Sequence, residues 1–111
     1  MKLSDLASIL DSIQLPYTYR AFPDGKAPNL PFICYLLDSA RPEAGDNINQ
    51  ATITTLSIEL YTEQKDFAIE QTVEDVLTAN EIVFSKDETW IEKERMQMVV
   101  YTTEVLINAS E

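Results

Sequence analysis

Two segments of the chain carry apolar residues at helical spacing. In the first, residues 4–14, Ser4 is placed to cap the first turn and Pro16 ends the segment. In the second, Asp66 precedes a stripe that runs to about Asn80, with apolar residues three and four positions apart: Ile69, Val73, Val76 and Leu77. Both patterns predict amphipathic helices.

Two further segments have the pattern of strands. Residues 32–37 are apolar on both faces, which predicts a central strand covered on both sides. In residues 52–61 the apolar Leu56, Ile58 and Leu60 alternate with more polar side chains. This alternation predicts a strand with one face on the core.

Weaker strand patterns complete the chain. A short strand is expected near Tyr17, before a proline-rich loop at 22–31. Residues 82–84 and 89–93 predict two short strands around a turn, and residues 96–107 predict a long final strand with contacts on both faces.

The predicted order of elements is α-β-β-β-α-β-β. This order indicates an α+β fold, an antiparallel or mixed sheet with two helices packed on it. The 111 residues, 45% of them hydrophobic, are expected to form a single domain spanning residues 1–111. No apolar run approaches the roughly 20 residues of a membrane span, so none is expected.

Residues 40–50 predict a long, exposed hairpin loop because they combine proline, glycine, aspartate and asparagine between two strand patterns. A loop of this kind can reach across an interface, and its candidate contact residues are Glu43, Asp46, Asn47 and Asn49. The loop lacks the ligand spacing, central glycine and distal glutamate of a calcium site, so no metal is expected there.

Charge is unevenly distributed along the chain. The net charge is −11, from 19 acidic and 8 basic residues: residues 1–50 hold 6 acids and 4 bases, and residues 51–111 hold 13 acids and 4 bases. This balance excludes an ordinary nucleic-acid binder, which needs a basic stripe. Glu70, Glu74 and Asp75 are predicted to form an acidic face on the second helix, either simply solvated or presented to a partner or a channel.

Catalytic equipment is not visible in the sequence. There is no histidine, Gly25 and Gly45 stand outside any phosphate-binding motif, and the only cysteine, Cys34, lies within an apolar run. The chain is therefore expected to be no enzyme and to need no cofactor.

Two aromatic residues are candidates for an interface. Phe67 falls on the polar side of the second predicted helix, and Trp90 lies among charged residues. The favoured alternative is that Phe67 folds back over the core and that Trp90 points inward.

Several segments together resemble the small tail-completion, or tail-terminator, proteins of long-tailed bacteriophages and prophages. The similar residues are 31–35 (PFICY), 57–63 (SIELYTE), the helix with Glu70, Val73, Glu74 and Leu77, then 90–92 (WIE), and Gln97, Val100, Tyr101, Glu104 and Val105. The resemblance covers most of the chain but includes no catalytic signature.

The resemblance implies a structural α+β subunit that assembles into a ring, typically a hexamer, which closes the tail tube and joins it to the head. The implied partners are other copies of the chain, the major tail protein and a head–tail connector protein. The negative charge and the short apolar runs predict no sequence-specific nucleic-acid binding and no membrane partner. The implied location is the virion, after synthesis in the host bacterial cytoplasm.

A competing hypothesis is an acidic inhibitor that mimics DNA and occupies a basic groove. A mimic is expected to spread acids over its whole surface, whereas the first half of this chain is nearly balanced. The charge distribution therefore favours assembly over mimicry.

Overall fold

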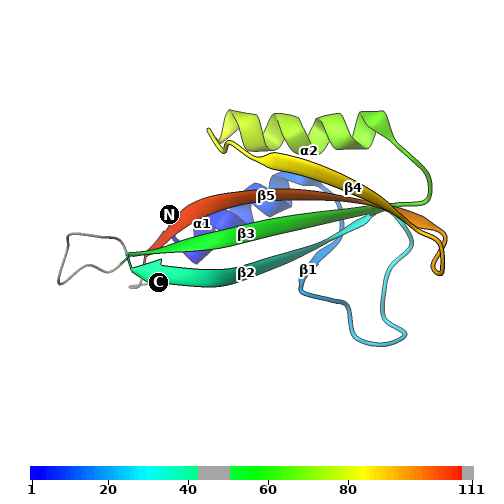
Figure 1. Cartoon of the computed structure of the whole chain (residues 1–111), viewed down its shortest axis with the longest axis horizontal. Helices are drawn as coiled ribbons and strands as arrows, with labels where there is room; N and C mark the ends of the chain where they lie inside the picture. The colour runs from blue at the N-terminus through cyan, green and yellow to red at the C-terminus, as the bar shows by residue number, and fades with distance from the viewer. Residues whose placement is uncertain (43–50, 109–111) are drawn as a thin grey trace.

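The computed structural model describes residues 1–42 and 51–108 (Figure 1). The elements follow the order α1 (Leu3–Ile13), β1 (Tyr17–Tyr19), β2 (Phe32–Pro42), β3 (Ala51–Thr62), α2 (Phe67–Ala79), β4 (Ser85–Ile91) and β5 (Met96–Asn108). This order confirms the predicted α+β class. The candidate loop residues Glu43, Asp46, Asn47 and Asn49 lie outside the described residues.

The five strands form one mixed sheet in the order β1-β2-β3-β5-β4. β1 pairs with β2 in parallel, and the other neighbours are antiparallel. The prediction that residues 32–37 form the central, doubly covered strand is wrong. β3 is the central strand, because in the described part of the chain β2 has just the short β1 on its outer side.

The two helices begin differently from one another. Asp66 caps α2 as predicted, and its Oδ1 accepts the Ile69 N–H at 3.0 Å. The predicted Ser4 cap of α1 is wrong, because the helix begins one residue earlier and Lys2 is the N-cap. The Lys2 N–H donates instead to Asp5 Oδ2 at 2.8 Å.

Both helices pack on the same face of the sheet, so the core lies on one side. The predicted alternation of β3 is confirmed, since Leu56, Ile58 and Leu60 are essentially unexposed. They join buried residues of both helices and neighbouring strands in one cluster: Leu6, Leu10, Ile13, Ile33, Val73, Leu77, Val99, Tyr101 and Val105. Burial of these apolar side chains is the main stabilising term of the fold.

The region after α2 differs from the prediction of two short strands around a turn. Residues 85–88 are part of β4, which pairs with β5 along its whole length. The reversal comes later, at residues 92–95, where Arg95 has φ 53°. Charged residues at 85–88 suggested a turn, but they belong to an edge strand, where charges are common.

Candidate interaction surfaces

A network of ion pairs connects α2 with β4. Glu70 Oε1 accepts from Lys65 Nζ at 2.9 Å and lies 3.0 Å from Lys86 Nζ. Lys86 Nζ also lies 2.7 Å from Glu74 Oε2, and Lys65 Nζ lies 2.9 Å from Glu88 Oε1. Two lysines thus bridge three carboxylates from the helix and the edge strand.

Neutral residues of β5 complete this network. Tyr101 Oη donates to Glu74 Oε2 at 2.8 Å, and Gln97 Nε2 donates to Glu88 Oε1 at 2.8 Å. Tyr101 and Gln97 are both buried. α2 is therefore held to the sheet by polar contacts beside its apolar stripe.

The network shifts the proton affinities of its members. Burial alone would raise the pKa of Glu74, but hydrogen bonds from Lys86 and Tyr101 outweigh it and lower that pKa. Hydrogen bonds to carboxylates raise the pKa of Lys65 and of Lys86. Burial, followed by the hydrogen bond to Glu74, raises the pKa of Tyr101. The charged forms of the lysines and of Glu74 are thus the stabilised forms.

The predicted acidic face of α2 is not formed as one surface. Glu70 is only 2% exposed, and its Oε2 has no hydrogen-bond partner within the described part of the chain. Glu74 is largely covered and ion-paired, while Asp75 is exposed and accepts from Gln71. The expectation of an outward acidic wall therefore fails for Glu70, because that residue faces the sheet.

The sequence did contain a signal for this placement. Glu70 lies three residues before Val73 and seven before Leu77, so all three share one helix face. A carboxylate on an apolar stripe needs cationic partners, and the flanking segments supply Lys65 and Lys86. Those two partners could not be assigned without the pairing of β4 with β5.

The two candidate aromatic residues are both exposed. Phe67 is 75% exposed, with Lys65 Nζ 4.8 Å from its ring centre, so it does not fold over the core. Trp90 is 42% exposed on the edge strand, and its Nε1 donates to Glu92 at 3.0 Å. The alternative that Phe67 folds back over the core is therefore wrong. Trp90 is also not buried in the core.

The sheet face opposite the helices carries a group of apolar side chains outside the core cluster. Cross-strand register aligns Phe32, Tyr61 and Met98 in one row across β2, β3 and β5. The adjacent row consists of Cys34, Glu59, Val100 and Asp87. We call the apolar residues Phe32, Leu36, Tyr61, Met98 and Val100 the open-face patch.

The proline-rich segment reaches the margin of this patch. The Phe22 and Phe32 rings lie edge to face with their centres 5.2 Å apart, and the ring centres of Phe32 and Tyr61 are 5.3 Å apart. Gly25, with φ +73°, takes a left-handed conformation within the turn that the hydrogen bond from Lys26 N–H to Pro23 O closes. The segment forms a loop between β1 and β2 that extends away from the sheet (Figure 1).

Cys34 is buried on the same face, as its apolar surroundings in the sequence predicted. Burial, and then the nearby Glu59 charge, raises the pKa of its thiol. A thiol held protonated is a poor nucleophile. Cys34 therefore fits a packing role.

The sheet ends in two different edges. On one side, β5 is the one strand that pairs with β4 within residues 1–42 and 51–108. On the other side, β1 covers β2 only at Ile33–Tyr35, and the Tyr19 hydroxyl bonds both the carbonyl oxygen (3.0 Å) and the N–H (3.3 Å) of Leu37. Beyond Leu37, β2 has β3 as its one neighbouring strand among the described residues.

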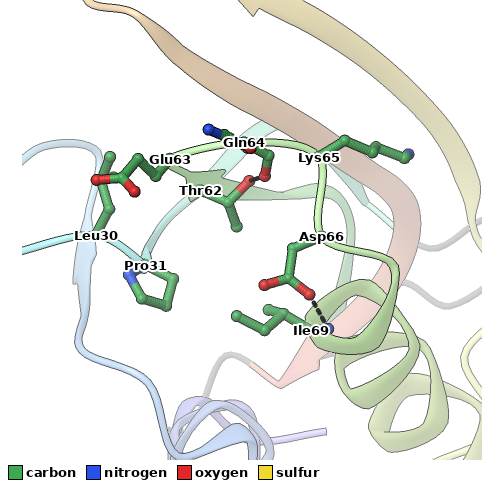
Figure 2. A pocket seen from close by; sticks show the side chains of 8 residues that line it. All are labelled: Leu30, Pro31, Thr62, Glu63, Gln64, Lys65, Asp66 and Ile69. Atoms are coloured by element: carbon green, nitrogen blue, oxygen red, sulfur yellow. Dashed lines mark hydrogen bonds between the residues drawn. The ribbon is translucent and has the colours of Figure 1, made fainter.

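A shallow hollow of about 430 Å³ lies where β3 leads into α2. Figure 2 shows Leu30 and Pro31 on one side of it and Asp66 on the other, with the Asp66 carboxylate bound to the N–H of Ile69. Lys65, at its rim, is already paired with Glu70 and Glu88. Two of the three charged side chains of the hollow, Lys65 and Asp66, are thus engaged within the chain, and the third, Glu63, is exposed.

The described residues contain neither a metal-binding cluster nor a membrane-spanning helix. Within residues 1–42 and 51–108, no group of three or more metal-binding side chains comes together. No helix in this part of the chain is long and apolar enough to cross a membrane.

Comparison with known proteins does not place the chain in a family. No protein-family model matches this chain, and no curated protein matches it in sequence. The function is therefore argued from the surfaces described above.

Proposed function

We propose that this chain is a structural subunit that assembles head to tail into a ring, and that this ring closes the tail tube of a long-tailed bacteriophage or prophage. The observation that carries the proposal is the presence of two different open edges on opposite sides of one sheet. Support for the phage setting comes from the resemblance of residues 31–35, 57–63 and the α2 segment to tail-terminator proteins.

Two unlike edges favour one geometry of association. If β4 of one copy pairs with the outer part of β2 of the next, every copy uses both edges. Such a contact is heterologous, and it produces a ring when the rotation closes. Pairing of backbone groups supplies the affinity, as in other cases of strand addition.

The charges on β4 restrict which strands can pair there. Lys86, Asp87 and Glu88 are exposed at this edge, and charged edge strands discourage indiscriminate pairing. Lys86 and Glu88 are also held by the ion-pair network with α2. An edge fixed in this way suits one defined neighbour.

Cysteine crosslinking tests the head-to-tail contact. In a Cys34→Ser background, Asp38→Cys and Thr89→Cys place one thiol at each edge, and both parent residues are exposed on the face opposite the helices. β2 and β4 are three strand spacings apart, about 14 Å, which is too far for a disulfide within one chain. We expect oxidation of the double variant to give a ladder of oligomers that ends in one closed species.

The two single-cysteine variants are the matched controls, because each can form at most a dimer. A double variant that also stops at the dimer would contradict the head-to-tail ring. So would a chain that remains monomeric under oxidation and at the end of purified tail tubes.

A further inference from the structure

The open-face patch is a second surface, separate from the sheet edges. Its residues lie on the side of the sheet without helices and are absent from the core cluster. Phe32 is nearly covered by its neighbours, while Leu36, Tyr61, Met98 and Val100 are half-buried. Contiguous apolar surface of this kind marks sites of interaction.

Two carboxylates lie on either side of the patch residue Val100, Glu59 within the patch on β3 and Asp87 at its margin on β4. Glu59 and Asp87 align with Val100, one on each neighbouring strand. Two strand spacings place their backbones about 10 Å apart. The Tyr61 hydroxyl donates to Glu59 Oε1 at 2.8 Å, which holds that carboxylate in place.

Neither carboxylate has a cationic partner within the described residues. The other charged strand residues on this face are Asp38, Arg41 and Glu104, and Arg41 is paired with Glu104 at 3.2 Å. Within the described residues, no lysine or arginine forms an ion pair with Glu59 or Asp87. The patch therefore carries unbalanced negative charge on both sides of Val100.

We propose that the open-face patch docks an apolar segment of a different protein, in which two lysine or arginine side chains pair with Glu59 and Asp87 on either side of Val100. Charge complementarity selects this occupant, because it would both cover the apolar residues and neutralise the carboxylates. The inference goes beyond ring formation, which uses the sheet edges.

A second copy of the chain is a poorer occupant. Its own open face would bring the same carboxylates opposite Glu59 and Asp87, and like charges in an interface are costly. Cations are also scarce on a chain of net charge −11. Four of its eight basic residues already form ion pairs within the chain: Arg41, Lys65, Lys86 and Arg95.

Selection from a library of random peptides displayed on filamentous phage tests this proposal, with the purified full chain as bait. We expect the selected peptides to combine lysine or arginine with large apolar residues. One such peptide is then synthesised and titrated. Its binding should shift the amide resonances of Tyr61, Met98 and Val100.

Matched variants separate the patch from the general acidity of the chain. Glu59→Gln/Asp87→Asn keeps the side-chain shapes and removes two charges, and it should weaken peptide binding by about tenfold or more, since two charge pairs are lost. Asp75→Asn/Glu81→Asn removes two charges from α2 and the residue after its C-cap, and should bind as the wild type does. Thermal unfolding checks that both variants are folded.

Three results would overturn the proposal. The first is selection of peptides without cations, and the second is equal weakening by the two double variants. The third is a wild-type dimer that Glu59→Gln/Asp87→Asn abolishes, which would assign the face to a second copy. None of these results depends on whether the edge cysteines give a ladder.

Discussion

Replacing Leu56 by alanine is expected to lower the free energy of unfolding by about 3 to 4 kcal/mol, within the range measured for leucine truncations in packed cores. Leu56 is 0% exposed on the central strand β3 and lies in the core cluster beneath the helices. Its truncation removes transfer free energy and leaves a cavity that rigid strands on both sides cannot close. Urea denaturation, with the slope compared between proteins, measures the loss.

The matched control is Leu36→Ala, the same chemical change on the open face. Leu36 aligns with Ser57 on β3 and is only half-buried, so we expect a loss of about 1 kcal/mol or less. Equal losses for the two variants would place Leu36 in a second buried layer. That result would contradict a core confined to one side of the sheet.

Replacing Lys86 by methionine is expected to cost about 2 to 3 kcal/mol at neutral pH. Removing one partner of a buried ion pair leaves an uncompensated charge, at a cost of roughly 3–5 kcal/mol. The expected value is lower here because Lys65 still pairs with Glu70 and because the Lys86 side chain is 35% exposed. Equilibrium unfolding of the two proteins measures the difference.

Lys93→Met is the control, because Lys93 is exposed and forms no ion pair within the described chain. Its cost is expected to stay within about 0.5 kcal/mol. A Lys86→Met protein as stable as Lys93→Met would show that the network contributes nothing to folding.

The loss of unfolding free energy caused by Lys86→Met should also depend on pH. The folded-state pKa of Glu74 is lowered, with Lys86 as one of its hydrogen-bond donors. A lowered carboxyl pKa stabilises the fold above the unfolded value of about 4.3, and this contribution is lost as pH falls through the folded value. The wild type loses this stabilisation in acid, so the gap between the two proteins should narrow there.

Elements with strong periodicity could be predicted from the sequence. The α2 stripe with its Asp66 cap and the alternation of Leu56, Ile58 and Leu60 each reflect a single dominant preference. Both elements appear where the pattern placed them.

Other features depend on tertiary pairing and could not be predicted in this way. The local residue types at 85–88 favour a turn, but pairing with β5 extends them as a strand. Likewise, residues 32–37 read as a central strand because both of their faces are apolar. One face packs on the core, and the other carries the open-face patch.

In the candidate sites, too, some features followed from the local sequence and others depended on tertiary pairing. The exposure of Asp75 followed from the helix pattern. The burial of Glu70 required Lys65 from the segment between β3 and α2 and Lys86 from β4. The acidity of the second half is thus partly neutralised within the fold. What remains on the surface includes Glu59 and Asp87, which only the register of β3, β5 and β4 brings to the same row.

We propose that the chain forms a ring at the end of a tail tube. Electron microscopy of the purified chain mixed with tail tubes that lack a terminator, with the mass measured in parallel by light scattering, tests it most directly. We expect ring-shaped caps at one end of the tubes and an assembled mass that is a fixed multiple of the chain. Bare tubes together with a strict monomer that blocks a DNA-binding enzyme would contradict the claim and favour a DNA mimic.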